Sequence, residues 1–150
     1  MGKKKAATET KEEMLKSTDK VAEASAKVAS SAAIKNVASG RIYIKATYNN
    51  TLISITDDTG NLLCWASSGG LGFAGPKKAT PFAASKVVAA LAEKLKKSNI
   101  TNFAVYVNGI GGGRDSALRS FANQGFTLTS ITDVTPIPHN GPRKPKTRRV

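Results

Sequence analysis

The sequence predicts a mixed α/β domain with the element order βββαβαβ. Residues 41–67 hold three short runs with strand character, separated by turn residues. Residues 82–97 repeat apolar side chains at helical spacing, which is typical of a helix with one buried face. Two later strand-like runs, 100–107 and 126–132, flank a second helical stretch. Strands and helices in this order over about 100 residues are typical of a two-layer α/β domain.

The first three strands are expected at 41–48, 51–56 and 62–67. Asn49 and Asn50 join the first two, and asparagine tolerates the left-handed conformation that a tight hairpin needs. Residues 57–61, Asp-Asp-Thr-Gly-Asn, have turn chemistry. The three strands are therefore expected to be antiparallel.

The long helix over 82–97 has clear boundary signals. Thr80 can cap its first turn and Pro81 suits its first position. Lysines gather at its carboxyl end, where the helix dipole favours cations. A strand at 100–107 and a glycine loop at 109–113 then lead to a second helix.

The second helix is expected over 115–124, with Asp115 in its first turn. Gly125 is its expected stop. The final strand covers 126–132.

Composition points to a polyanionic partner. The chain has 150 residues, 23 Lys and Arg against 10 Asp and Glu, a net charge of +13 and a pI near 10.1. One cysteine excludes an intramolecular disulfide, and Cys64 is expected to pack as a small hydrophobe. One Cys and one His do not make a common zinc site, so no metal or cofactor is expected. Without a secretory or transmembrane pattern, the expected location is the cytoplasm, with no membrane partner.

Three regions are expected along the chain. Residues 1–38 are low in complexity and are expected to form a disordered, mobile extension. Residues 39–134 form the α/β domain. Residues 135–150 form an extended basic arm with four prolines, and its last twelve residues hold five Lys or Arg and no acid. Such an arm needs a polyanion, and nucleic acid is the first candidate.

The glycine loop 109–113 joins a strand to a helix, where free backbone N–H groups can bind phosphate. We favour a phosphate-contacting turn to which Arg114 adds charge. The alternative is a tight turn that needs glycines for its geometry. A dinucleotide fingerprint is incomplete, because Arg114 stands where its third glycine belongs.

The loop 67–78 combines four glycines with Lys77 and Lys78 just before a helix start. Lysines there suggest that an anion lies between them and the helix. Phe73 is expected either to stack on a base or to fold back into the core.

Catalysis is unsupported, because each acid of the domain has an ordinary turn or helix role. His139 is expected to contact RNA rather than to act as a base. Asn140 precedes Gly141, which leaves the Asn side-chain carbonyl open to attack by the next backbone nitrogen. We therefore expect deamidation and isoaspartate formation at Asn140.

Several motifs together resemble one known family. They are the segments 47–51, 56–57 and 60–61, Trp65, the pair 72–73, the segment 80–84, the pair 113–114 and the block 133–141, Asp-Val-Thr-Pro-Ile-Pro-His-Asn-Gly. From residue 35 to residue 150 the chain resembles the bacterial small-subunit ribosomal protein eleven family. Positions 74 and 108, usually basic in the family, are Ala and Asn here.

The resemblance implies an RNase-H-like mixed sheet without nuclease activity. It implies a place on the small-subunit platform, where the protein bridges ribosomal RNA helices and lines the cleft for the Shine-Dalgarno duplex of the mRNA. It also implies neighbours: small-subunit proteins seven, eighteen and twenty-one, and initiation factor three.

We therefore predict a non-enzymatic protein of the small ribosomal subunit that binds ribosomal RNA by shape and backbone contacts. Alternatives are a nucleotide-binding enzyme built on the glycine loop and a basic nucleic-acid-binding protein outside the ribosome, such as a DNA-compacting protein. The expected RNA contacts are Lys45, Asn49, Asn50, Thr51, Ser67, Ser68, Gly70, Gly72, Phe73, Gly75, Lys77, Lys78, Thr80, Gly111, Gly113, Arg114, His139, Asn140, Gly141, Arg143, Lys144, Lys146, Arg148 and Arg149.

Overall fold

The computed structural model describes residues 39–96 and 100–146, so the expected mobile extension over 1–38 lies outside the described residues. The described elements are β1 (Ser39–Ala46), β2 (Thr51–Asp57), β3 (Leu62–Ser67), the 3-10 helix η1 (Gly75–Ala79), α2 (Pro81–Leu95), β4 (Asn102–Asn108), α3 (Gly113–Asn123) and β5 (Thr127–Asp133). The βββαβαβ order is confirmed. The sequence pattern does not predict η1, because none of its residues is buried and it carries no apolar periodicity.

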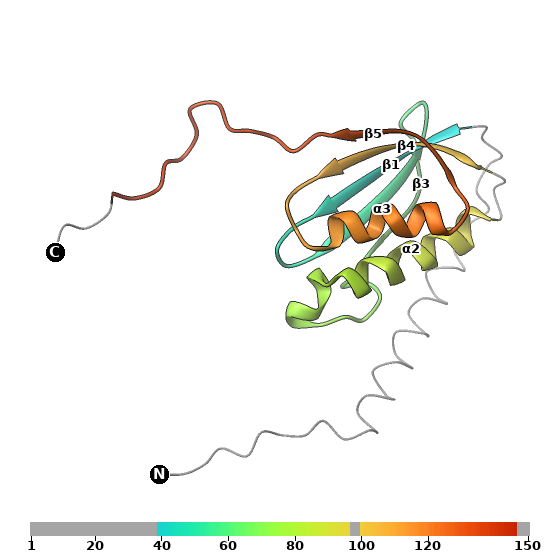
Figure 1. Ribbon diagram of the computed structural model, residues 1–150, viewed down its shortest axis with the longest axis horizontal. Helices are drawn as coiled ribbons and strands as arrows, with labels where there is room; N and C mark the ends of the chain where they lie inside the picture. The colour runs from blue at the N-terminus through green and yellow to red at the C-terminus, as the bar shows by residue number, and fades with distance from the viewer. Residues whose placement is uncertain (1–38, 97–99, 147–150) are drawn as a thin grey trace, which may run out of the picture.

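The sheet has five strands in the order β3-β2-β1-β4-β5. The first three strands are antiparallel, as predicted, whereas β4 lies parallel to β1 and β5 parallel to β4. The crossovers through α2 and α3 both move in the same direction across the sheet. Because such crossovers are right-handed, both helices lie on the same side of the sheet, as Figure 1 shows. This mixed sheet agrees with the fold that the resemblance implies.

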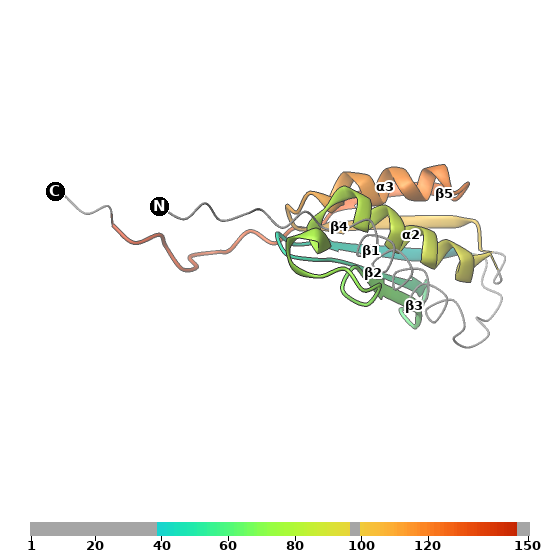
Figure 2. The same ribbon diagram turned by 90° about the horizontal axis from the view of Figure 1, so that it is seen from below.

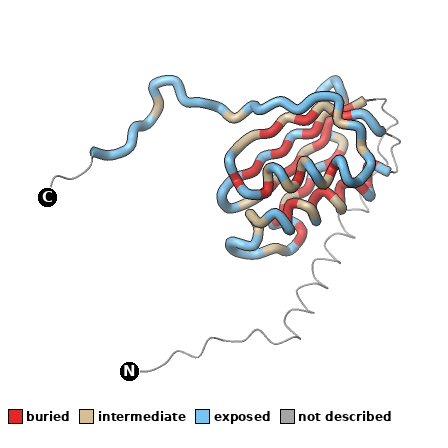
Figure 3. The backbone as a smooth tube through the Cα atoms, viewed as in Figure 1, coloured by how far each residue is buried: buried red, intermediate tan, exposed pale blue. Residues whose placement is uncertain are grey.

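The core fills the space between the sheet and the two helices, where the buried residues of Figure 3 gather. Ile42 and Ile44 of β1 and Phe103 of β4 have no exposed surface, and Leu91 of α2 packs in the same cluster. Each such side chain stabilises the fold by about 1.5–3 kcal/mol relative to an exposed position. Cys64 also belongs to this core, and burial raises the pKa of its thiol to about 11. The prediction that it packs as a small hydrophobe is confirmed.

The helix boundary signals are largely confirmed. The Thr80 hydroxyl accepts a hydrogen bond from the Ala83 N–H at 3.3 Å, and Pro81 is the first residue of α2. Helix α2 ends at Leu95, two residues before the predicted end at 97, with Lys96 as its C-cap. Helix α3 begins at Gly113, two residues earlier than predicted, which places Arg114 in its first turn. Gly125 follows α3 with a φ of 86°, in the left-handed region.

Candidate nucleic-acid interface

One end of the sheet gathers most of the predicted contacts. The carboxyl ends of β1, β3, β4 and β5 lie there with the start of β2, because Lys45 pairs with Asn108, Ala46 with Thr51, Leu52 with Ser67 and Val107 with Asp133. The hairpin 47–50, the loop 68–74, the glycine loop and the start of the arm therefore share this end. Parallel strands place their following loops at the same edge of a sheet, which explains part of this convergence.

Hydrogen bonds tie these segments to one another. The Gly111 N–H donates to the Ala46 carbonyl at 3.0 Å, and the Ser68 N–H donates to the Thr51 carbonyl at 3.0 Å. The Ser116 hydroxyl of α3 donates to the Pro81 carbonyl at the start of α2, at 2.6 Å. These bonds join the glycine loop to β1, the loop 68–74 to β2 and α3 to α2. We call this end of the domain, with its four segments, η1 and the start of α2, the loop end.

The predicted contacts divide into three groups by accessibility. Those that are exposed or half-buried are Lys45, Asn49, Asn50, Ser67, Gly70, Gly72, Phe73, Gly75, Lys77, Lys78, Thr80, Arg114, His139, Asn140, Gly141, Arg143, Lys144 and Lys146. Those that are buried are Thr51, Ser68, Gly111 and Gly113. Arg148 and Arg149 lie outside the described residues.

The buried group corrects the sequence prediction. Thr51 and Ser68 have no exposed surface, and the Ser68 hydroxyl donates to the Thr51 carbonyl at 3.4 Å. A Cβ at Gly113 would lie 2.4 Å from the Thr51 hydroxyl oxygen, so this glycine lets α3 approach β2. In this structure these residues hold the loop end together and are not available to RNA.

The glycine loop is a tight turn that needs its glycines, which is the alternative to the phosphate-contacting turn that we favour from the sequence. A Cβ at Gly109 would lie 2.1 Å from the Ala46 carbonyl oxygen, and one at Gly111 would lie 2.2 Å from that of Thr47. The Gly109 N–H donates to the Thr135 hydroxyl at 3.1 Å, and the Gly111 N–H is bonded to Ala46. Close backbone packing explains these two glycines, and their N–H groups are not free for phosphate.

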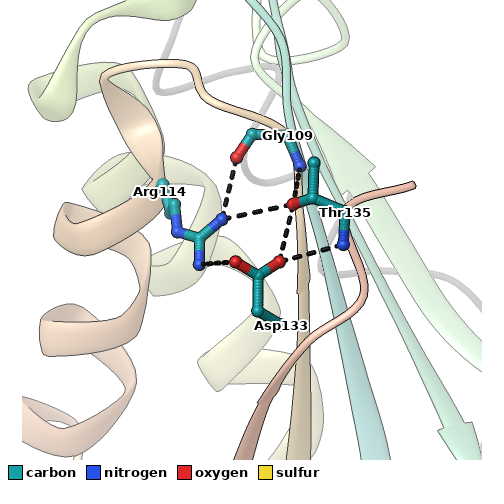
Figure 4. A network of polar contacts seen from close by, with 4 residues as sticks. All are labelled: Gly109, Arg114, Asp133 and Thr135. Carbon is teal, nitrogen blue, oxygen red and sulfur yellow. Dashed lines mark hydrogen bonds and ion pairs between the residues drawn. The ribbon is translucent and has the colours of Figure 1, made fainter. Parts of the chain in front are cut away.

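Arg114 is held in a polar network at the same end, shown in Figure 4. Its guanidinium forms an ion pair with Asp133 at 2.8 Å and donates to the Gly109 carbonyl at 3.0 Å and to the Thr135 hydroxyl at 3.4 Å. The Asp133 carboxylate also accepts from the Thr135 N–H at 2.9 Å and hydroxyl at 2.6 Å. Arg114 therefore joins α3 to the glycine loop, to the end of β5 and to Thr135 at the start of the arm.

This network shifts the pKa values of its members. The hydrogen bond from Arg114, followed by that from Thr135, holds the pKa of the Asp133 carboxyl well below its usual range. The same ion pair raises the pKa of Arg114. The Asp133 contribution to stability is therefore fully present above the unfolded-state pKa of about 3.9 and is lost as the pH falls through the lower folded-state pKa.

We expect the free energy of unfolding to fall more steeply below about pH 4 in the wild type than in an Asp133→Asn variant, because the amide of the variant has no proton to take up. Urea titrations at pH values from about 5 to 2 would measure both slopes. The slope left in the variant includes Asp57, whose pKa is lowered to about 2 by hydrogen bonds from Asn61 and Thr59. Equal slopes would show that the Asp133 network contributes nothing to acid sensitivity.

The lysine-bearing loop is folded on itself. The Ser67 hydroxyl accepts from the Gly70 N–H at 3.2 Å, and the Gly72 N–H donates to the Gly69 carbonyl at 3.1 Å. Lys77 and Lys78 then lie in the last turn of η1, directly before α2. Their cations thus stand beside the amino-terminal end of the long helix, as the sequence predicts.

Phe73 folds back toward the core, which is one of the two positions expected from the sequence. It is half-buried, packs against the core cluster and meets the Phe82 ring edge-on, with centroids 6.1 Å apart. Two aromatic residues at this end are exposed: Tyr48 of the hairpin, at 76%, and Phe82, at 62%. The Phe82 ring centroid lies 5.5 Å from the Lys86 ammonium. Sequence reasoning missed Phe82, although its place opposite the apolar stripe of α2 was a usable signal.

The arm leaves the loop end as extended, mainly exposed chain. The Val134 N–H donates to the Val107 carbonyl at 2.8 Å, and no helix or strand follows within the described residues. Figure 1 and Figure 2 both show the arm running away from the domain. Asn140 has a φ of 54°, and its side-chain oxygen accepts from Arg143 at 3.3 Å.

The described residues show neither a metal-ligand cluster nor a membrane-spanning helix. They contain no group of three or more His, Cys, Asp and Glu side chains that could hold a metal ion. Among the same residues, no helix has the length and apolarity needed to cross a membrane.

Comparison with known proteins decides the family. The family model described as ribosomal protein S11 matches residues 40–149. The chain belongs to this family. The resemblance seen in the sequence is thereby confirmed.

Curated relatives agree over most of the chain, and each carries the name small ribosomal subunit protein uS11. The relative from Treponema pallidum (strain Nichols) is 53% identical over 116 residues, which is 77% of this chain and 92% of that protein. The relative from Psychromonas ingrahamii is 53% identical, and the match covers 77% of this chain and 90% of that protein. The relative from Helicobacter pylori is 49% identical, and the match covers 77% of this chain and 89% of that protein. As a member of this structural family, the chain is a ribosomal protein and not an enzyme.

Proposed function

We propose that the protein is a structural component of the small ribosomal subunit in the cytoplasm, where its loop end and arm bind and bridge ribosomal RNA helices. The observation that carries this proposal is that the basic arm starts at the end of the sheet where η1 holds Lys77 and Lys78. These cations can neutralise phosphates, while exposed Asn49 can offer hydrogen bonds. Both kinds of contact suit recognition of folded RNA by its shape and backbone.

The resemblance supports a more specific placement. We propose that the protein lies on the platform, beside small-subunit proteins seven, eighteen and twenty-one, and helps to form the cleft for the Shine-Dalgarno duplex. Initiation factor three is proposed as a nearby partner. Chemical crosslinking of assembled subunits, followed by peptide mass spectrometry, would test each neighbour separately.

Co-sedimentation tests the ribosomal proposal. After a high-salt wash of ribosomes and separation of subunits, the protein should remain with the small subunit and be missing from the large one. Competition by duplex DNA provides a second test. If duplex DNA displaced the protein as well as small-subunit RNA does, a general basic nucleic-acid-binding protein would be the better description.

We also propose that Asn140 deamidates. The Gly141 nitrogen attacks Cγ of Asn140 and expels ammonia, and water then opens the resulting succinimide to aspartate or isoaspartate. Asn140 is exposed, and Arg143 donates to its side-chain oxygen, which polarises the carbonyl under attack.

The chain offers a matched control in Asn108-Gly109. There the glycine N–H donates to the Thr135 hydroxyl and directly follows a strand. These constraints keep the nitrogen from the geometry needed to attack the Asn108 side chain. Peptide mass spectrometry of aged protein should find isoaspartate at position 140 and intact Asn at position 108. Intact Asn140, or equal conversion at both sites, would contradict the proposal.

A further inference from the structure

The face of the sheet opposite the two helices carries a row of side chains across all five strands. Tyr43 of β1 pairs with Ser54 of β2, which pairs with Trp65 of β3. On the other side Tyr43 pairs with Tyr106 of β4, which pairs with Thr132 of β5. We call this surface the open sheet face, because within the described chain both helices lie on the other side (Figure 1).

Three aromatic rings lie in this row, of which Tyr43 and Trp65 are exposed and Tyr106 is half-buried. The rings of Tyr43 and Tyr106 are stacked, with centroids 5.2 Å apart and 17° between their planes. Tyr43 is 36% exposed and Trp65 is 54% exposed. Trp65 lies two strands from Tyr43, which is about 10 Å at the usual strand spacing. RNA-recognition domains stack bases on aromatic rings that lie on the solvent face of a sheet. The outer faces of the Tyr43–Tyr106 pair and the Trp65 ring provide surfaces of this kind.

The charge of the open sheet face is positive. Arg41 and Lys45 lie two residues to either side of Tyr43 on β1, and therefore share its face. No described strand position on this face holds a carboxylate. Asp57, paired with Gly40, and Asp133, paired with Val107, fall on the helix side by alternation. Asp58 lies in the turn after β2, where it is hydrogen-bonded to Ser39.

The charge of each possible ligand indicates which of them the open sheet face binds. Residues 1–38 of this chain hold eight Lys against five acids, so their net charge does not complement a cationic face. A second copy of the chain, at +13, complements it no better. An RNA strand supplies both the negative charge and the planar groups that the face can accept.

We propose that the open sheet face binds a single-stranded segment of RNA, with bases stacked on Tyr43, Tyr106 and Trp65. The phosphates of that segment lie against Arg41 and Lys45. Unpaired RNA is required, because an A-form duplex keeps the faces of its bases stacked inside. The identity of the partner as RNA rests on the proposed function, whereas the surface is distinct from the loop end and the arm.

The chain carries its own probe, because Trp65 is its only tryptophan. Titration of the full chain with single-stranded oligouridylate should quench Trp65 fluorescence, and a duplex RNA of equal length should quench it far less. A Tyr43→Leu, Tyr106→Leu double variant should bind oligouridylate about tenfold more weakly or worse, because two stacking platforms are lost. The Tyr43→Phe, Tyr106→Phe variant keeps both rings and should bind nearly as the wild type does.

A pair of arginine variants gives an independent readout. Arg41→Gln should lower the slope of log affinity against log salt for oligouridylate by about 0.7, the value for one phosphate of a single strand. Arg119→Gln removes the same charge from an exposed position on α3, in the other layer, and should leave this slope unchanged.

The outcomes separate this proposal from the proposed function. If oligouridylate failed to quench Trp65 while the chain still bound small-subunit ribosomal RNA, the open-face proposal would be wrong and the proposed function would stand. If the chain bound neither, the proposed function would fail as well. Quenching by small-subunit proteins but not by RNA would show that the face docks a protein, which also overturns the proposal.

Discussion

Replacing Gly111 with alanine is expected to lower the free energy of unfolding by about 3 kcal/mol or more. A Cβ there would lie 2.2 Å from the carbonyl oxygen of Thr47, 2.7 Å from its carbonyl carbon and 3.0 Å from that of Ala46. These are backbone atoms at the end of β1 and the start of the hairpin after it, so no change of side-chain rotamer relieves the clash. The loop must move, and the hydrogen bond from Gly111 to Ala46 is then lost.

The next residue is the matched control. A Cβ at Gly112 would meet only the Ala79 carbonyl oxygen, at an ordinary 3.6 Å, and its φ of −62° suits any residue. Gly112→Ala should therefore be neutral or stabilising by up to about 1 kcal/mol. Urea titrations of both variants would give the comparison. Equal effects of the two substitutions on stability would contradict the close-packing account of Gly111.

Local periodicity was sufficient to predict the elements of this fold. The alternation in β1 and the helical repeat of α2 each depend on a few neighbouring residues, and the structure confirms both. Turn and cap residues such as Thr80 and Gly125 act over the same short range. By contrast η1, with no buried residue, has no periodic signal for the sequence to carry.

The site was predicted less completely because its geometry depends on distant partners. Gly111 is required by a hairpin some 65 residues earlier in the chain, so its sequence neighbourhood also fits a phosphate-binding turn. In the sequence Arg114 looks like an unpaired cation, but the fold places the Asp133 carboxylate 2.8 Å from its guanidinium. Ser68 is a polar loop residue in the sequence, yet the end of the sheet buries it completely.

Local sequence patterns could not predict the open sheet face either. Alternation along β1 separates Ile42 and Ile44 from Tyr43 and Lys45, but it does not say whether a second layer covers the polar side. That follows from the strand order, because two right-handed crossovers in one direction place both helices on one face. Strand order was the long-range fact that the sequence patterns did not supply.

Removal of residues 139–150 is expected to lower the slope of log RNA affinity against log salt by roughly 4. These residues hold five Lys or Arg and no acid, and each phosphate neutralised by such a residue contributes about 0.7–0.9 to the slope. Between 50 and 200 mM salt, the affinity of the truncated chain for a small-subunit RNA fragment should therefore change roughly 100- to 500-fold less than that of the full chain. Filter binding or anisotropy across this range would measure both slopes.

Two full-length variants separate the charge of the arm from its stiffness. Replacing its five Lys and Arg with Gln keeps the prolines and should reproduce the lower slope, because counterion release depends on charge alone. Replacing Pro136, Pro138, Pro142 and Pro145 with Ala keeps the charge and should leave the slope unchanged. That variant should still bind more weakly, since a flexible arm loses more conformational entropy on RNA than one held extended by proline. A truncated chain with the slope of the full chain would show that the arm does not lie on phosphates, and the cations of the loop end would then have to account for the binding.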